Sequence, residues 1–182
     1  IQANEYYNFL QKNQGIIKRQ SRRYIAMDEI ERVRLYLSEK NPELKIIVLE
    51  EDTSTAPLAA QALGTEVGQI AKSILFKSNG DKYFMIVAAG DVKMDNKALK
   101  QLLGSRPRMA NAEEVLAVTG FNVGGVCPFA LPNPIPIFLD ESLKRYDVVY
   151  AAAGTANTAL PISYEELMRL TGGSPCRVAR DN

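Results

Sequence analysis

Apolar and polar residues occur along the chain in blocks that predict short helices mixed with short strands. Ile30, Val33 and Leu37 recur at helical spacing, and the acids around the first of them suit the positive end of a helix dipole. Other helices are predicted where capping residues precede apolar positions at this spacing, and strands where short apolar runs end at turn residues. The predicted helices cover residues 27–40, 58–63, 96–103, 111–119, 141–144 and 163–171. The predicted strands cover residues 45–49, 67–76, 83–89, 135–139 and 147–153.

Turn residues between these segments predict how some of them connect. Residues 78–81, Ser-Asn-Gly-Asp, are a strong turn signal, so the strands on either side are predicted to form a β-hairpin. The spaced prolines at 132, 134 and 136 keep the backbone extended where the next strand begins, and they exclude a central strand at that point. The small residues at 154–158 are predicted to form a loop.

The mixture of elements predicts the fold class. Helices and strands follow one another without a strict βαβ repeat, which favours an α/β fold with a mixed, barrel-like sheet surrounded by helices. At 182 residues, 46% of them hydrophobic, the chain can bury one core but is short for two average domains. We therefore expect a single domain over residues 27–182 and an N-terminal extension over residues 1–26. The basic cluster at residues 18–23 fits either a solvated face or a phosphate contact.

Overall charge does not identify a binding partner. The chain carries 22 basic and 21 acidic residues, a formal net charge of +1, so any nucleic-acid site must be a local patch. No apolar run approaches the roughly 18 residues that span a bilayer, and the N-terminal residues lack the pattern of a signal peptide. We therefore expect a cytoplasmic protein without a membrane partner.

The absence of histidine from the sequence limits the available chemistry. It excludes Ser-His-Asp and Cys-His catalysis, His-ligated metal centres and imidazole acid–base chemistry near neutral pH. Cys127 and Cys176 do not form a metal-binding pair; two isolated thiols fit a reducing compartment, although a disulfide between them stays open. We expect no metal and no cofactor, and chemistry based on lysine, carboxylates, hydroxyls, backbone groups or the substrate itself.

Two stretches are the main candidates for a site. In residues 120–129, the adjacent Gly124 and Gly125 are followed by Pro128, which suits a backbone that approaches a ligand closely. The alternative is a tight turn between a helix and a strand. Lys72 lies within an apolar strand, where an ammonium group snorkels, pairs with a charge or faces a site. The alternative interpretation is that Lys72 is an edge-strand lysine whose side chain points to water.

Three further residues have two interpretations each. Cys127 is either a nucleophile or a small pocket-lining residue, and the missing histidine favours the second. Asp91 is either a turn residue or a polar partner of Lys72. Among the hydroxyls around Thr53, which precede a predicted helix, caps are expected and one side chain is a candidate to face the site.

The order of these pieces closely resembles the YbaK/ProX family of aminoacyl-tRNA editing domains. The resemblance covers residues 30–170, and the matching stretches are residues 53–64, 71–76, 88–91, 119–129 and 149–154. Each motif is weak by itself, but their order and spacing are specific. Two positions depart from the pattern: Ala130 stands where many members have glycine, with a possible change in pocket width, and Cys127 stands where serine or proline is common.

The resemblance implies a hydrolase that removes a wrong amino acid from the 3′ end of a transfer RNA, often the one for proline, in trans. It also implies a fold related to the insertion domain of bacterial prolyl-tRNA synthetases, and a synthetase as a second candidate partner. Lys72 corresponds to the functional lysine of the family, and Gly154 to its second glycine loop. Residues 124–128 correspond to its G-x-x-x-P loop, so Val126 and Pro128 become candidate substrate-binding residues.

These residues can support ester hydrolysis without a triad. Backbone N–H groups of the Gly124-Gly125 turn suit a developing oxyanion, because fixed dipoles need no reorganisation. Lys72 suits the terminal phosphate or ribose of the transfer RNA. The ribose hydroxyl or the substrate side chain would then assist proton transfer, with a small residue such as alanine or cysteine as cargo. Two other functions stay open: a non-catalytic module that binds the acceptor end or a synthetase, and a small-molecule-binding domain.

Overall fold

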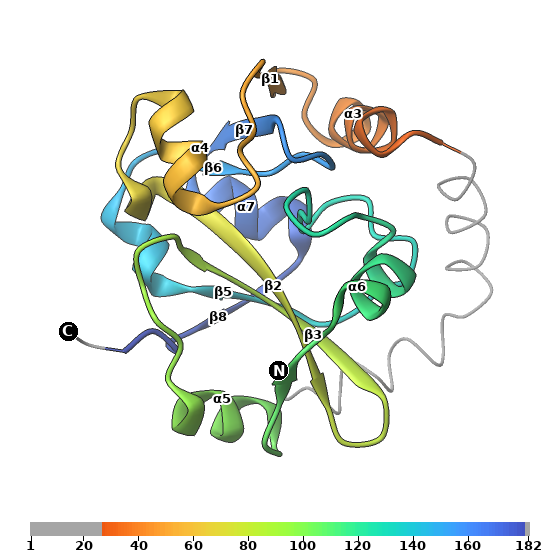
Figure 1. Cartoon of the computed structure of the whole chain (residues 1–182), viewed down its shortest axis with the longest axis vertical. Coiled ribbons are helices and arrows are strands. Elements are labelled where there is room, and N and C mark those ends of the chain that lie inside the picture. The colour runs from red at the N-terminus through yellow and green to blue at the C-terminus, as the bar shows by residue number, and fades with distance from the viewer. Residues whose placement is uncertain (1–26, 181–182) are drawn as a thin grey trace.

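The structure, a computed structural model, describes residues 27–180 (Figure 1). The predicted extension at residues 1–26, with its basic cluster, lies outside the described residues. The described helices are α3 (Glu29–Lys40), α4 (Ala56–Leu63), α5 (Asn96–Leu103), α6 (Ala112–Thr119) and α7 (Tyr164–Thr171), with the 3₁₀ turns η1 (Val67–Gln69) and η2 (Glu141–Arg145). The strands are β1 (Ile47–Val48), β2 (Ile70–Ser78), β3 (Lys82–Ala89), β4 (Arg108–Met109), β5 (Ile137–Asp140), β6 (Val149–Ala151), β7 (Thr158–Ile162) and β8 (Ser174–Cys176).

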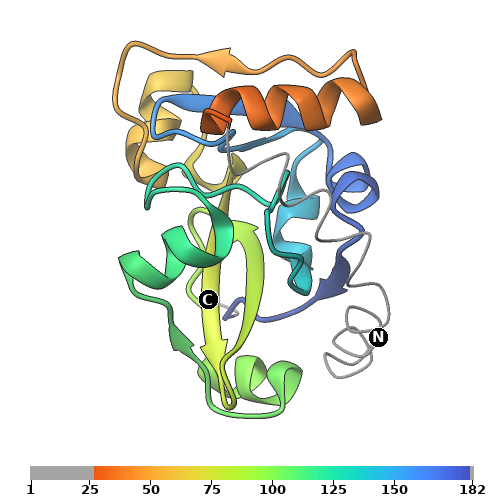
Figure 2. The same ribbon diagram turned by 90° about the vertical axis from the view of Figure 1, so that its right-hand side faces the viewer.

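A mixed sheet of eight strands forms the centre of the domain, in the order β1-β7-β6-β2-β3-β5-β8, with β4 beside β2. The predicted hairpin is confirmed: β2 and β3 are antiparallel, and in Figure 2 they extend from the middle of the molecule to its lower end. On its two sides, β6 runs parallel to β2 and β5 runs parallel to β3. This confirms the predicted α/β fold with a mixed sheet. Among the described strands, however, β1 and β8 do not pair with each other, so the sheet is open and does not close into a barrel.

Three short strands were not predicted from the sequence: β4, β7 and β8. The predicted loop at 154–158 ends where β7 begins, and β7 pairs with both β1 and β6. Its sequence contains Pro161, a residue that argues against a paired strand. Strands β4 and β8 form by pairing with β2 and β5, which are distant in the sequence, so no local pattern marked them.

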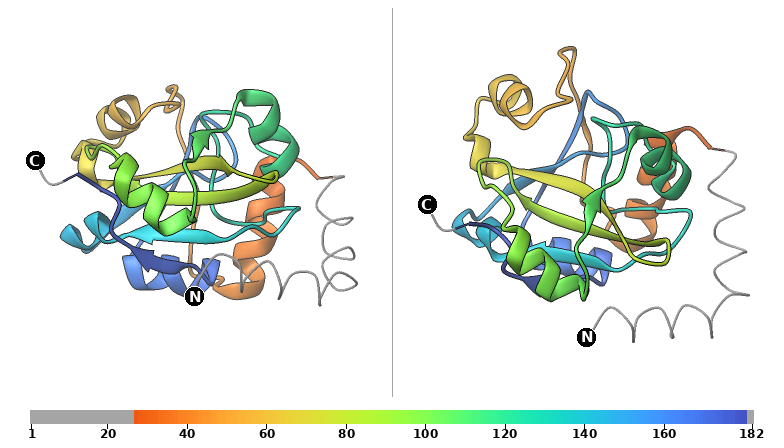
Figure 3. Two further views of the ribbon diagram at one scale, coloured as in Figure 1. Left: turned by 90° about the horizontal axis from the view of Figure 1, so that it is seen from below. Right: turned by 60° about the horizontal axis from the view of Figure 1, so that its bottom comes forward.

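The two faces of the β2–β3 hairpin pack against different helices (Figure 3). One face joins Leu75 and Val87 to a large core that includes residues of α3, α6 and α7. The other face, with Phe76 and Ile86, packs on α5. A third, small cluster joins α4 to Ile70 at the start of β2. In the part of the chain that the structure describes, no helix has the length and apolar character that crossing a membrane requires.

Candidate active site

A cavity of about 110 Å³ lies where strands β2 and β6 separate. The two strands are paired only at Ile70↔Tyr150 and Ala71↔Ala151, after which β6 ends. Helix α4 covers one side of this gap, and the loop with Gly124 approaches from another. The lining residues are Thr53, Ser54, Thr55, Ala56, Ala59, Leu63, Ile70, Ala71, Lys72, Ser73, Gly124, Val126, Tyr150, Ala151, Ala152, Thr158 and Ala159.

Helix α4 is fixed over the cavity by strong local signals. Thr55 caps its first turn by accepting a hydrogen bond from the Leu58 N–H, and Pro57 occupies the first turn, where a missing N–H costs nothing. Gly64 ends the helix in the left-handed region at φ 64°. These residues hold the apolar face of α4 against β2.

Lys72 is half-buried and lines the cavity. Its ammonium group donates hydrogen bonds to the carbonyl oxygens of Gly90 at 3.2 Å and Val92 at 2.5 Å. Burial lowers the pKa of Lys72 below its ordinary value, and the nearby negative charge of Asp91 opposes that shift. The side chain is therefore held in place by backbone groups and is not an edge-strand lysine that points freely to water.

The glycines of the predicted loop allow close backbone contacts. Gly124 has φ 97°, and a Cβ atom there would lie 2.9 Å from the Cβ of Ser54. A Cβ on Gly125 would lie 2.5 Å from the carbonyl oxygen of Gly154, so the two glycine loops of the chain pack backbone against backbone. Gly154 is itself held against the first turn of α3, where a Cβ would meet the carbonyl oxygen of Glu29 at 2.9 Å.

The backbone amides of this loop differ in availability. The Gly125 N–H donates to the carbonyl oxygen of Asn122 at 3.0 Å and thus closes a turn. For Gly124 and Val126, the structure records no hydrogen bond from the N–H to any residue it describes, and both residues line the cavity. Within this loop, the free amide donors beside the cavity therefore belong to Gly124 and Val126, whereas the Gly125 amide is engaged in the turn.

A family model for the aminoacyl-tRNA editing domain matches residues 50–170, which include all the lining residues of the cavity. The chain belongs to this family. The resemblance to YbaK/ProX editing domains is therefore confirmed.

Relatives of this editing domain include proteins that carry editing names. The chain is 41% identical over 135 residues to "Uncharacterized protein YwhH" of Bacillus subtilis, covering 74% of this chain and 86% of that one. It is 27% identical over 124 residues to "Putative Cys-tRNA(Pro)/Cys-tRNA(Cys) deacylase EbsC" of Enterococcus faecalis, covering 68% and 76%. A crystal structure described as "a putative trans-editing enzyme for prolyl tRNA synthetase" superimposes with a TM-score of 0.79 at 35% identity, covering 85% and 99%.

The editing domain also matches part of larger enzymes. It is 34% identical over 100 residues to the proline–tRNA ligase of Bacillus licheniformis, where the match covers 54% of this chain but 17% of the ligase. The similarity to a synthetase is thus confined to one segment of that protein.

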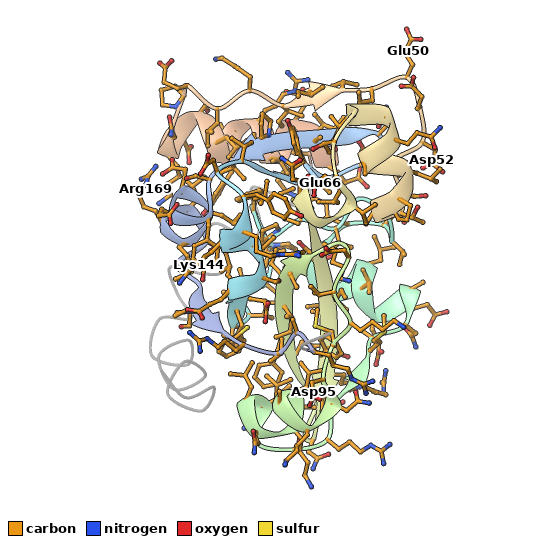
Figure 4. All side chains as sticks on the ribbon, turned by 90° about the vertical axis from the view of Figure 1, so that its left-hand side faces the viewer. Glu50, Asp52, Glu66, Asp95, Lys144 and Arg169 are labelled. Atoms are coloured by element: carbon orange, nitrogen blue, oxygen red, sulfur yellow. The ribbon has the colours of Figure 1, made fainter. Side chains whose placement is uncertain are left out.

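Thr53 lines the cavity of the editing domain, whereas the residue that caps helix α4 is Thr55. The side chain of Thr53 is buried and donates to the carbonyl oxygen of Ala156 at 2.9 Å, as does its backbone N–H at 2.6 Å. It thereby joins the segment before α4 to the loop before β7. Its neighbours Glu50 and Asp52 project into solvent (Figure 4).

Asp91 does not line the cavity. Its carboxylate accepts two hydrogen bonds from the Arg145 guanidinium, at 3.0 and 2.5 Å, and this pairing lowers the pKa of Asp91. Among the described residues, the structure records no direct ion pair between Asp91 and Lys72. Asp91 therefore influences Lys72 through its charge alone.

Cys127 and Pro128 lie in the hydrophobic interior and outside the cavity lining. The Cys127 thiol is fully buried and contacts the carbonyl oxygen of Phe129 at 3.8 Å, and burial raises its pKa to about 12. A thiol in this state is a poor nucleophile, so the geometry favours a structural role. Both cysteines are free thiols.

The sequence analysis missed one polar residue in the cavity lining and one that supports the glycine loop from outside the lining. Ser73 lines the cavity, and among the described residues its buried hydroxyl has no hydrogen-bond partner. Arg32, on the buried side of α3, donates to the carbonyl oxygens of Thr119 and Gly120, immediately before the glycine loop. The position of Ser73 next to Lys72 was a signal that could have found it.

Proposed function

We propose that this editing domain hydrolyses the ester bond of a mischarged transfer RNA in trans. The observation that carries the proposal is that Lys72 and Gly124 line one small cavity although they are distant in the sequence. The editing names of its relatives supply the reaction class. Its cargo is a small amino acid such as alanine or cysteine, since a cavity of about 110 Å³ has little room for a large side chain.

In the proposed reaction, the carbonyl oxygen of the ester lies against the free N–H groups of Gly124 and Val126. These amides are fixed by the fold, so they stabilise the oxyanion that develops when an oxygen nucleophile attacks the carbonyl carbon. The C–O bond to the ribose then breaks, and the ribose oxygen takes a proton. The net reaction consumes one water and yields a free amino acid and an uncharged transfer RNA.

Lys72 serves as a positioning charge in this scheme. Two of its three N–H donors are occupied by Gly90 and Val92, which leaves one donor and the positive charge for the ribose or phosphate of the terminal nucleotide. Tyr150 is the second titratable residue among the described residues that line the cavity. With no carboxylate or thiol in that lining, proton transfer is assigned to the substrate's own ribose hydroxyl or side chain.

The test uses transfer RNA for proline charged with alanine or with cysteine. We expect the wild-type domain to release the amino acid and Lys72→Ala to lower kcat/KM about 10- to 100-fold, since a hydrogen bond to a charged group contributes about 1.5–3 kcal/mol. Lys100→Ala is the matched control, because Lys100 is exposed on α5 and does not line the cavity. Absence of hydrolysis by the wild type, or equal rates for the two variants, would contradict the proposal.

A second candidate function is a non-catalytic module that binds the acceptor end of transfer RNA. The same absence of carboxylates and thiols from the described cavity lining favours it. This function predicts salt-sensitive binding of uncharged transfer RNA, weakened by Lys72→Ala, with no loss of the ester beyond the uncatalysed rate.

A further inference from the structure

Strand β2 has an unpaired edge at the cavity. In an antiparallel pair, alternate residues direct both backbone polar groups toward the partner strand and the others direct them away. The Leu75 carbonyl accepts from the Ala110 N–H on the side away from β3, and the facing residue Met85 donates its N–H to Pro136, away from β2. Alternate residues of β2 starting from Leu75 therefore direct their N–H and C=O groups away from β3. Ser73 is one of them.

The groups of Ser73 have no partner on that side. Strand β6, which pairs with the start of β2, ends at Ala151, and β4 joins β2 only from Phe76 onward. Among the described residues, no hydrogen bond to the N–H, C=O or hydroxyl of Ser73 is recorded. The Ser73 hydroxyl is buried, and the residue lines the cavity, so its unpaired N–H and C=O offer a donor and an acceptor to a ligand there.

We propose that Ser73 binds the aminoacyl group of the substrate as a one-residue β-strand: its N–H donates to the ester carbonyl oxygen and its C=O accepts from the α-ammonium. This inference rests on the proposed deacylase function and concerns the same cavity. An aminoacyl group carries its nitrogen and its carbonyl oxygen at the spacing of a strand residue, on one side. It can therefore exchange two hydrogen bonds with one residue, as facing residues of an antiparallel pair do.

The arrangement is compatible with the glycine loop. The ester carbonyl oxygen has two lone pairs and the oxyanion formed from it has three, so the oxyanion can accept one hydrogen bond each from Ser73, Gly124 and Val126. Both backbone bonds are independent of the cargo side chain, which suits a site that must recognise the common part of an amino acid.

The pairing also orients the cargo side chain. Facing residues of an antiparallel pair point their side chains to the same side of the sheet, with Cβ atoms about 5 Å apart. The side chain of an L-amino acid would thus share the side occupied by the Ser73 side chain. This makes Ser73 the cross-strand neighbour of the cargo.

The first experiment compares Ser73→Pro with Ser73→Ala. Proline removes the unpaired N–H without removing a ladder hydrogen bond and is tolerated at strand edges, while alanine removes only the hydroxyl. With alanyl-tRNA for proline, we expect kcat/KM of the proline variant to be about tenfold or more below that of the alanine variant. Equal values for two folded variants would overturn the inference.

The second experiment does not depend on turnover or on the proline variant. It uses 3′-alanylamino-3′-deoxyadenosine, in which a stable amide replaces the ester, and follows the Ser73 amide proton by NMR in the wild-type protein. We expect a downfield shift of this proton, and binding about tenfold weaker for the analogue without the α-amino group, 3′-propionylamino-3′-deoxyadenosine. Failure of the alanyl analogue to bind, an unshifted Ser73 proton or equal binding of the two analogues would overturn the inference. Analogue binding through Ser73 without ester hydrolysis would uphold it and overturn the deacylase proposal alone.

Discussion

At the scale of single residues, Ala130 departs from the family pattern at a position where the backbone conformation favours glycine. The sequence suggested that alanine in place of glycine would change the width of the pocket. In the structure, Ala130 is buried in the core and does not line the cavity, but it adopts φ 50°, in the left-handed region that favours glycine. The glycine common at this position therefore matches a backbone requirement.

This conformation predicts that Ala130→Gly stabilises the protein. Relief of left-handed strain contributes about 1–2 kcal/mol, and the greater freedom of glycine in the unfolded chain removes about 0.4–1 kcal/mol of that. We expect a net gain of about 0.5–1 kcal/mol in the free energy of unfolding, measured by urea denaturation. Ala117→Gly, at an exposed position within α6, is the control and is expected to destabilise by about 1 kcal/mol. Destabilisation by both substitutions would contradict this account.

At the scale of elements, the C-terminal helix α7 holds α3 in place, and α3 in turn contacts Gly154 of the second glycine loop. The Asn41 side chain, at the end of α3, donates to the Glu166 carboxylate of α7 at 2.6 Å. Arg169 also pairs with Glu166, and together these partners lower the pKa of Glu166 to about 2. Contacts between helices far apart in the sequence thus support the site.

The lowered pKa of Glu166 predicts a pH-dependent contribution to stability. Its folded-state pKa of about 2 lies below the unfolded value of ~4.3, so the stabilisation is complete above ~4.3 and is lost as pH falls toward 2. We expect Glu166→Gln to lower the free energy of unfolding by about 0.5 kcal/mol at pH 7, because glutamine keeps the Asn41 contact and loses the charge pair. Urea denaturation between pH 7 and pH 2 measures the difference from wild type. A difference that stays constant across this range would contradict the assignment.

At the scale of the whole molecule, Arg32 connects helix α3 to the glycine loop. Its guanidinium is buried, donates to the Thr119 and Gly120 carbonyl oxygens at the end of α6, and lies 4.2 Å from the centre of the Phe121 ring. A Cβ on Gly120 would meet this guanidinium at 2.5 Å, so Gly120 makes room for it. The position of the first residues of the loop 120–129 therefore depends on how Gly120 and Phe121 pack against Arg32 of α3.

Arg32→Met is expected to destabilise the protein by about 2–4 kcal/mol and to reduce deacylation, because it leaves the two carbonyl groups without this donor and loosens the loop. Arg34→Met is the matched control on the same helix, since Arg34 is exposed and its ion pair with Glu31 contributes little. Thermal unfolding and the alanyl-tRNA assay report the two effects. Similar behaviour of the two variants would show that Arg32 does not support the loop.

The sequence by itself determined the features that depend on neighbouring residues. The β2–β3 hairpin followed from its Ser-Asn-Gly-Asp turn, and the caps at Asn111 and Ser163 followed from short side chains placed at the start of helical patterns. The order of weak motifs was also enough to indicate the editing family, because their spacing reflects a shared chain path.

Tertiary structure alone decided which groups face the cavity. Lys72 and Ser73 are adjacent in the sequence, but their surroundings differ. The Lys72 ammonium group is held by carbonyl oxygens of the turn after β3. Ser73 has unpaired backbone groups because β6 ends beside it. Cys127 and Arg32 are buried by elements distant in the sequence, so neither the thiol's raised pKa nor the arginine's hold on the glycine loop was visible locally. Burial, strand edges and pKa shifts are properties of surroundings that the chain creates only when it folds.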